Sequence, residues 1–366
     1  MYMPAPYLAQ FPKSTVKRYI DMKKFRILAL LLAVCMAAAL LAGCAKTGKP
    51  ADTQDAVTLP ETSEETPVVT EPAEETPAEE KPVEAQPSEA ESTAVSVTDM
   101  ADRAITLEKP AERVVALTAA DCEIIYALGA GDTLVGRGEY CDYPAEVFDV
   151  PSVQSGYETN IEQILALEPQ VLFMSTMAQT EEQVQQLENA GVTVVVSDAQ
   201  DIEGTYTAIK MIGAVLGKDA EADALCESMQ ATFAELTEKV TGDGSKSVYF
   251  EVSPLEYGLW TAGKHTFMDE VAVMLGLKNC FDDVDGWGEI SEEQVLERNP
   301  DYIVTISMYY GEGPTPTEEI ASRAGWENVT AVKDGKILNL QNNELSRPGP
   351  RLADGAKAMY DFVYGE

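Results

Sequence analysis

Basic side chains are scarce in this sequence, and histidine occurs only once. The 26 Lys and Arg residues stand against 62 Asp and Glu, which gives a formal net charge of -36 at pH 7. Such an acidic chain repels phosphate backbones and has no basic stripe, so nucleic acid is excluded as a partner. Sites that hold bare zinc or manganese use several histidines, and this chain has only His265. An imidazole-based catalytic triad would have this histidine as its one candidate and no evident nucleophile.

Motifs of enzymes and of metal sites are missing as well. The chain has no G-x-S-x-G, H-E-x-x-H or P-loop sequence. Its cysteines form neither C-x-x-C nor any other zinc-ligand spacing. The cysteines of the globular part are Cys122, Cys141, Cys226 and Cys280. The sequence is compatible with disulfide bonds between these cysteines and equally with buried free thiols.

The apolar run at 27–41 is shorter than the span of about 20 residues that a membrane helix needs. It follows a basic segment, 23–26, and ends at Leu41-Ala42-Gly43-Cys44. This order is typical of a cleaved export signal, although an uncleaved short membrane helix would share the run. The segment resembles a bacterial lipoprotein signal. The resemblance implies a signal region at 1–44, a true start at Met22 and lipidation of Cys44.

From residue 45 to 92 the composition shifts to Glu, Thr, Pro and Ala, and Lys81 is the only base between Asp52 and Glu91. Such a segment has too little apolar surface to offset the entropy of ordering it. Its prolines and like charges extend it. We expect a disordered acidic linker that holds a folded domain away from the membrane.

Short apolar runs alternate with helical patterns from about residue 93 onward. Buried strands are predicted at 114–117, 171–174, 192–196, 247–252, 302–306 and 336–340. Helices are predicted at 121–128, 181–190, 201–216, 221–240, 266–275 and 351–364, the first of them amphipathic. Alternating strands and helices are typical of parallel βαβ units. We therefore predict an N-terminal α/β lobe at 93–205, an interlobe helical segment at 206–242 and a C-terminal α/β lobe at 243–366.

The second lobe repeats a motif of the first. Asn-Ile-Glu-Gln-Ile-Leu at 160–165 matches Ser-Glu-Glu-Gln-Val-Leu at 291–296, and a proline and then a strand follow each copy. Tyr-Ala-Leu-Gly at 126–129 is echoed by Val-Met-Leu-Gly at 273–276. We expect two similar lobes, and ligands favour the interface between such domains.

Each copy of the motif begins a helix that carries a matched glutamate. Asn160 and Ser291 are N-caps, and the glutamine three residues later is expected to complete a capping box in each helix. Glu162 and Glu293 then lie at the second helical position, off the apolar face. Either glutamate alone would stabilise the helix dipole by about 0.3–1 kcal/mol. As a pair, with one on each lobe, they predict a two-point docking surface.

From about residue 112 to the C-terminus, the chain resembles the cobalamin and iron-siderophore binding lipoproteins of ABC importers, through the Glu-Gln-[Ile/Val]-Leu motif of both lobes. The resemblance implies an α/β fold of two Rossmann-like lobes joined by a long interlobe helix, similar to class III periplasmic binding proteins. It also implies that Glu162 and Glu293 engage arginines on the two permease subunits. Charge-assisted contacts of this kind are geometrically specific.

The same resemblance places ligand contacts on loops between the lobes. The residues assigned to the ligand are Tyr140, Trp287, Arg347 and Asn343, with Trp260 as a further candidate. Tyr140 and Trp260 could also be packed aromatics. One cleft tryptophan of the cobalamin binders falls in Ser155-Gly156-Tyr157, and another falls at Met174-Ser175, which has no aromatic. These departures count against cobalamin itself but not against the class.

The resemblance, together with the missing enzyme motifs, implies a substrate-binding protein of an ABC importer rather than an enzyme. It would bind a ferric siderophore or a cobalamin-type corrinoid at the extracytoplasmic face of the bacterial membrane, as a lipid-anchored monomer without a cofactor or a resident metal. Its partners would be a permease dimer and its ATPase. Haem stays open, because a tyrosine such as Tyr140 can serve as an axial ligand. A surface glycoside hydrolase would need Glu162 and Glu293 about 5–10 Å apart.

Overall fold

The segments that precede the globular part lie outside the described residues. The structure is a computed structural model of the whole chain, and it describes residues 94–365 apart from 157–158, 177–179 and 342. The signal region, Cys44, the acidic linker and Tyr157 therefore stay predictions from sequence. Across the described residues, no helix combines the length and the apolar character that a membrane crossing requires.

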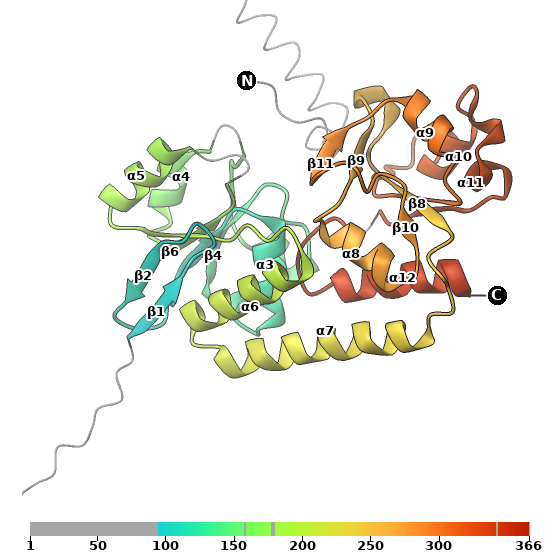
Figure 1. Cartoon of the computed structure of the whole chain (residues 1–366). Coiled ribbons are helices and arrows are strands. Elements are labelled where there is room, and N and C mark those ends of the chain that lie inside the picture. The colour runs from blue at the N-terminus through green and yellow to red at the C-terminus, as the bar shows by residue number, and fades with distance from the viewer. Residues whose placement is uncertain (1–93, 157–158, 177–179, 342, 366) are drawn as a thin grey trace, which may run out of the picture. The chain divides into compact units, whose positions relative to one another are not determined.

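Five parallel strands form the sheet of the first lobe (Figure 1). They are β3 (Val114–Ala116), β4 (Leu134–Gly138), β5 (Ser152–Val153), β6 (Val171–Met174) and β7 (Thr193–Val196). Their order is β5-β4-β3-β6-β7, and β3 and β6 are buried along their whole length. Continuous apolar strands suit a parallel sheet that is covered on both faces. The strand order reverses at β3, and doubly wound sheets bind ligands outside the carboxyl ends at such a point.

A hairpin and four helices complete the first lobe. Strands β1 (Val95–Thr98) and β2 (Ala104–Leu107) pair antiparallel. The helices are α3 (Ala119–Ala127), α4 (Ile161–Ala166), α5 (Glu181–Asn189) and α6 (Ile202–Leu216), with 3₁₀ turns η1 (Gly131–Thr133) and η2 (Ala145–Asp149). Helix α6 contacts both β1 and α3. The boundary predicted between residues 205 and 206 thus falls within a helix that lies against the first lobe.

Helix α3 differs from its prediction. The sequence predicts an amphipathic helix at 121–128, but every residue from Asp121 to Ile125 is buried. The helix contacts β3, β4 and α6, and Arg347 and Arg351 from a distant loop bond to its Glu123. The amphipathic prediction is therefore wrong, because tertiary contacts cover the charged positions as well as the apolar ones.

A mixed sheet forms the second lobe. Its strands are β8 (Ser247–Ser253), β9 (Trp260–Ala262), β10 (Lys278–Asn279), β11 (Trp287–Glu289), β12 (Tyr302–Thr305) and β13 (Ile337–Asn339). The order is β11-β9-β8-β12-β13, and β10 pairs with the start of β8. Its helices are α8 (Phe267–Met274), α9 (Glu292–Arg298), α10 (Pro316–Ala321), α11 (Thr330–Lys333) and α12 (Leu352–Tyr364), with 3₁₀ turns η3 (Leu255–Tyr257) and η4 (Trp326–Asn328).

The topology confirms the internal repeat. In each lobe the strand after the matched helix, β6 or β12, lies between the first strand, β3 or β8, and an outer strand, β7 or β13. Gly129 and Gly276 follow α3 and α8 with φ of +66° and +64°. Glycine reaches this left-handed conformation at little cost, so both helices end in the same way. The lobes differ on the other side, where β4 is parallel to β3 but β9 is antiparallel to β8.

Helix α7 (Asp219–Lys239) connects the two lobes (Figure 1). It contacts α6 of the first lobe and α8 and α12 of the second. Its buried side chains, at Ala222, Cys226, Met229, Phe233 and Leu236, follow helical spacing along one face. Its 21 residues correspond to a length of about 30 Å. The long interlobe helix that the sequence predicts is therefore present.

A buried ion pair stabilises the second lobe. Glu251 on β8 accepts hydrogen bonds of 2.6 and 2.9 Å from Arg323, and the two side chains are 1% and 2% exposed. Arg323 also pairs with the more exposed Glu319 at 2.5 Å. Its guanidinium lies 4.6 Å from the ring centroid of Trp326. The positive charge of Arg323 is thus compensated by two carboxylates in the core and at its edge.

We expect Glu251→Gln to lower the free energy of unfolding by about 1.5–3 kcal/mol, because it leaves Arg323 buried without its main counter-charge. Glu319→Gln is the control, and its cost should stay below about 1 kcal/mol because that carboxylate faces solvent. Urea unfolding measures both values. Equal losses in the two variants would show that the buried pair has no special weight.

Candidate functional site

The loops after the parallel strands of the first lobe carry the first candidate residues. Strand β4 leads into the segment 139–143, in which Tyr140 is half-buried, Cys141 is buried and Tyr143 is exposed. Strand β3 leads into Thr118, whose hydroxyl accepts the hydrogen bond of Asp121 N–H at the start of α3. These loops lie at the carboxyl edge of the sheet, where doubly wound folds bind their ligands.

Arg347 bridges the two lobes. It lies in the loop after β13 and forms ion pairs with Glu123 at 2.8 Å and with Asp142 at 2.6 Å. Its guanidinium also donates to the backbone oxygen of Tyr140 at 3.3 Å. Arg351, just before α12, adds an ion pair of 2.6 Å with Glu123. We call Glu123, Asp142, Arg347 and Arg351 the interlobe ion network.

The interlobe ion network keeps its arginines charged although they are partly or largely buried. Burial by itself would lower the pKa of Arg347, but the hydrogen bond and charge of Asp142 and the charge of Glu123 outweigh burial and raise that pKa. The pKa of Arg351 is likewise raised by Glu123 against the effect of burial. Arg347, which the resemblance assigned to the ligand, therefore already has two carboxylate partners.

Asn343 lies in the same loop as Arg347 and is buried. Its Oδ1 accepts a hydrogen bond from the Ser346 hydroxyl at 3.0 Å, and its φ is +66°. Asparagine adopts this left-handed conformation more readily than most residues. The contacts that the structure shows for Asn343 thus shape the loop that presents Arg347.

Trp287 also reaches the other lobe. Its indole Nε1 donates to the side-chain oxygen of Gln200 at 3.3 Å, and its ring centroid lies 5.4 Å from that of Phe267. Trp260 lies on the neighbouring strand β9 and packs, half-buried, against the hydrophobic core. Of the two tryptophans assigned to the ligand, Trp287 is the one that the structure places where the lobes meet.

Two tyrosines without a sequence prediction lie near the same place. Tyr309 and Tyr310 follow β12 and are 37% and 57% exposed. Burial and the negative charge of Asp142, a residue of the first lobe, raise the pKa of Tyr310. The sequence did contain a signal for these two tyrosines. They come just after a predicted strand, and that position is again the carboxyl end of a sheet. Glu123 gave no such signal, since its partners are more than 200 positions away.

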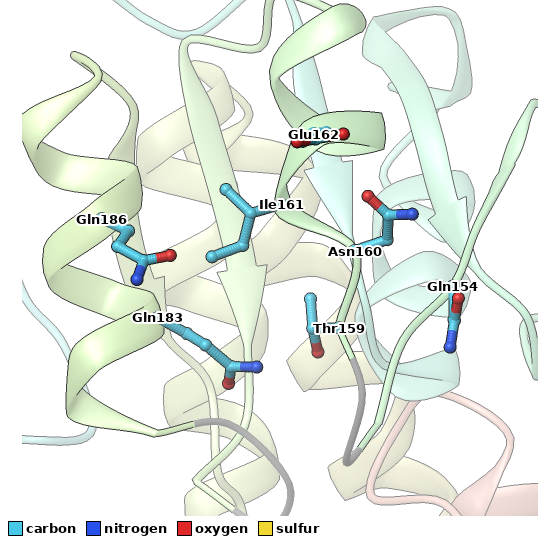
Figure 2. Close-up of a pocket in the computed structure, with 7 residues that line it drawn as sticks. All are labelled: Gln154, Thr159, Asn160, Ile161, Glu162, Gln183 and Gln186. Carbon is cyan, nitrogen blue, oxygen red and sulfur yellow. The ribbon is translucent and has the colours of Figure 1, made fainter. Parts of the chain in front are cut away.

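Glu162 lies exposed at the second position of α4, as predicted (Figure 2). Asn160 caps the helix by accepting the hydrogen bond of Gln163 N–H at 3.0 Å. The side chain of Gln163 accepts from Gln154 N–H at 2.9 Å instead of from the cap residue. The second half of the capping box predicted for this helix is therefore wrong, because the preceding strand's loop takes the acceptor.

An open polar hollow of about 430 Å³ adjoins Glu162. Figure 2 shows Gln183 and Gln186 of α5 on one side of Ile161, with Asn160 and Gln154 on the other side. The Glu162 carboxylate has no hydrogen bond or ion pair with another residue that the structure describes. A free carboxylate beside side-chain amides can receive an incoming polar or cationic group.

Glu293 has the equivalent place on α9, and it is exposed as well. Here the predicted capping box is complete, with both hydrogen bonds between Ser291 and Gln294. The backbone N–H of Glu293 and the hydroxyl of Ser291 hold the pKa of Glu293 below its ordinary value. This carboxylate is therefore ionised at neutral pH, and it belongs to the second lobe whereas Glu162 belongs to the first.

Two features of the described residues bear on metal binding, namely the grouping of His, Cys, Asp and Glu side chains and the place of His265. In the described part of the chain, no cluster of three or more His, Cys, Asp or Glu could hold a metal ion. His265 pairs with Asp285 at 2.8 Å, and its side chain is 70% exposed. This confirms the expectation that the sole histidine is an exposed loop residue.

Comparisons with known proteins agree with this geometry. A model of the family described as Periplasmic binding protein matches residues 114–344. An uncharacterized ABC transporter substrate-binding lipoprotein of Bacillus subtilis (strain 168), YvrC, is 34% identical over 68% of this chain and 79% of its own. A vitamin B12-binding protein of Salmonella choleraesuis is 28% identical over 66% of this chain and 86% of its own.

A solved structure is similar as well. It is a possible iron-binding, periplasmic solute-binding protein of Staphylococcus epidermidis ATCC 12228, with 31% identity and a TM-score of 0.59. The match covers 70% of this chain and 100% of that chain. All three of these relatives are named as binding or transport proteins, and none as an enzyme.

Proposed function

The chain belongs to the periplasmic binding protein family, and from this premise we propose that it captures a metal chelate outside the membrane and delivers it to an ABC importer. A protein of this kind is a binding component and not an enzyme. Its partners would be the permease of the importer and the ATPase that drives it. The chelate is held between the lobes, beside the interlobe ion network.

One observation carries the docking part of the proposal: each lobe exposes a glutamate at the same position of the same motif. Glu162 and Glu293 both lie in the first turn of the helix that precedes β6 or β12. A free carboxylate can bind an arginine side chain in a bidentate manner. Two such contacts, one on each lobe, would fix both the orientation and the register of docking.

We propose a ligand with little negative charge, either a cobalamin-type corrinoid or a ferric siderophore of the hydroxamate type. Arg347 and Arg351 already pair with carboxylates, so they are poorly placed to bind an anionic chelate. Trp287 and Tyr310 offer aromatic faces, and large, partly planar ligands pack well on such faces. Vitamin B12 and iron in the names of two relatives support the same classes.

We propose that the protein is held at the extracytoplasmic face of the bacterial membrane by a lipid on Cys44. The basic segment, the apolar run and the small residues before this cysteine support the proposal. A relative that is named a lipoprotein supports it too. The acidic linker at 45–92 would then be the tether between the lipid and the first lobe.

A thermal-shift panel should identify the ligand class. The panel contains cobalamin, cobinamide, a ferric hydroxamate, a ferric catecholate and haem. A ligand at about 100 times its Kd adds about 2.7 kcal/mol of stability, which raises the unfolding midpoint by roughly 5–10 °C for a domain of this size. We expect a corrinoid or the hydroxamate to give this shift and the polyanionic catecholate to give none.

Two variants test whether the shift comes from the proposed site. Trp287→Ala should reduce the shift, measured from its own ligand-free midpoint, because it removes an aromatic face between the lobes. Val273→Ala, on the exposed side of α8, should leave it unchanged. A shift with the catecholate alone would contradict the charge argument. A silent panel together with cleavage of a glycan substrate would favour the glycoside hydrolase instead.

A further inference from the structure

Two of the buried thiols lie together at the carboxyl edge of the first sheet. The Sγ of Cys122, on α3, is 3.8 Å from the backbone oxygen of Ala116, and the Sγ of Cys141 is 3.9 Å from the same oxygen. Both residues have no exposed surface. Burial and a hydrogen bond with the Cys141 thiol raise the pKa of the Cys122 thiol well above its ordinary value. The two thiols therefore lie against the same carbonyl group and interact with each other.

The other two cysteines lie apart from this pair. Cys226, on α7, is 3.9 Å from the backbone oxygen of Tyr206, in the contact between α6 and α7. Cys280 belongs to the hydrophobic core of the second lobe, with Tyr249 and Phe281. Of the four buried cysteines, only Cys122 and Cys141 are thus arranged as a pair.

We propose that Cys122 and Cys141 form a disulfide bond in the exported protein. The proposal rests on the extracytoplasmic location proposed above, because disulfides form and persist in oxidising compartments. A disulfide-bearing thiol oxidase of that compartment is the oxidant. One cysteine thiolate attacks the oxidase disulfide, and the second then displaces the oxidase from the mixed disulfide. The Cys122–Cys141 S–S bond forms, and the oxidase leaves as a dithiol that carries the two protons.

The burial of both sulfur atoms fixes when the bond would form. A thiol that is buried and has a raised pKa is a poor nucleophile, and an enzyme cannot reach it in the folded protein. The exchange must therefore occur before α3 and the segment 139–143 close over the pair. After closure, the same burial protects the bond from reductants.

The bond would hold two members of the interlobe ion network in place. Glu123 is next to Cys122 and Asp142 is next to Cys141, and both carboxylates pair with Arg347. A covalent link between α3 and the segment 139–143 would keep these carboxylates in position while Arg347 is away from them. Preorganisation of this kind reduces the ordering that ligand binding requires.

A site-resolved thiol count tests the proposal. The full chain, exported and processed by a bacterial host, is treated with N-ethylmaleimide during lysis and again after unfolding without reductant. We expect Cys226 and Cys280 to be alkylated, and Cys122 and Cys141 to stay protected until a reductant is added. Trypsin cleaves at Arg137, between the two cysteines. Peptides 114–137 and 138–210 should therefore remain linked until reduction.

A serine variant changes the number of reactive thiols in opposite directions, depending on whether the disulfide is present. With the disulfide, Cys122→Ser raises the number of reactive thiols among these four cysteines from two to three, because Cys141 is released. Without it, the same variant lowers the number from four to three. Cys226→Ser is the matched control and lowers the count by one in either case. Four reactive thiols in the wild-type chain, or a different linked pair, would overturn the proposal.

Thermal unfolding gives a second readout that needs neither ligand nor permease. A disulfide that closes a loop of about 20 residues should raise the unfolding midpoint by roughly 6–12 °C. The wild-type chain is therefore unfolded in a reductant and refolded in its presence, which should lower the midpoint by this amount and leave the midpoint of Cys122→Ser/Cys141→Ser unchanged. If the wild-type midpoint does not respond to the reductant, the two thiols are not bonded. This outcome is independent of whether the protein delivers a chelate.

Discussion

Replacement of both docking glutamates by alanine should abolish delivery of the ligand and leave its capture intact. Each charge-assisted contact with a permease arginine contributes about 1.5–3 kcal/mol. Loss of both contacts should therefore weaken docking by about 10²- to 10⁴-fold. Ligand affinity should not change, because Glu162 and Glu293 lie on α4 and α9 and not on the loops around the interlobe ion network. Calorimetry measures the affinity, and uptake of labelled ligand by cells measures the delivery.

Matched controls separate docking from a general loss of charge. Glu203 is exposed at the second position of α6, the same helical position as the docking glutamates. Glu297 is exposed on α9, close to Glu293 along the chain. The double variant Glu203→Ala/Glu297→Ala should transport like the wild type. If the docking variant loses ligand affinity along with transport, the assignment of these two residues is wrong.

Removal of the Glu123 carboxylate should have the largest effect on stability. Glu123 is 2% exposed at its side chain and forms ion pairs with both Arg347 and Arg351. Glu123→Ala leaves these guanidinium groups without that partner, and breaking a buried ion pair costs about 3–5 kcal/mol. The unfolding midpoint should fall by roughly 10 °C or more. Ligand binding should weaken as well, because Arg347 then loses its contact with α3 and keeps, of its described contacts with the first lobe, those with Asp142 and Tyr140.

A double-mutant cycle tests whether the loss arises from the pair itself. The double variant Glu123→Ala/Arg347→Ala should cost clearly less than the two single variants together, with a coupling free energy of about 0.5–3 kcal/mol. Glu139→Ala, an exposed glutamate of the same segment, should change the free energy of unfolding by no more than about 0.5 kcal/mol. Additive losses at Glu123 and Arg347 would mean that the pair does not hold the lobes.

Elements with strong local patterns could be predicted from the sequence. The strand predicted at 171–174 matches β6, and the helix predicted at 201–216 begins one residue before α6. The repeated motif placed Glu162 and Glu293 at the second helical position because caps and apolar spacing are local properties. These are the residues on which the docking proposal depends, so the sequence alone reached that part of the site.

Features that depend on distant partners could not be predicted. Strands β9, β10 and β11 have two or three residues each, too few for a period to be recognised. Glu123 resembles a solvent-facing charge in its helix until Arg347, 224 positions later, is brought beside it. Thiol spacing was equally uninformative, because Cys122 and Cys141 meet only through the packing of α3 against the loop after β4. These contacts are set by tertiary structure.

The rigid connection through helix α7 has a consequence for the rate of transport by the importer. The chain passes from one lobe to the other through a rigid rod, and the contacts of Gln200 with Phe267 and of Glu123 with Arg347 restrain the lobes further. The span between the two docking carboxylates should then hardly differ between vacant and loaded molecules. Both would compete for the same importer. In a cell that makes far more of this protein than there is ligand, vacant molecules would therefore occupy the importer and slow the uptake of the ligand.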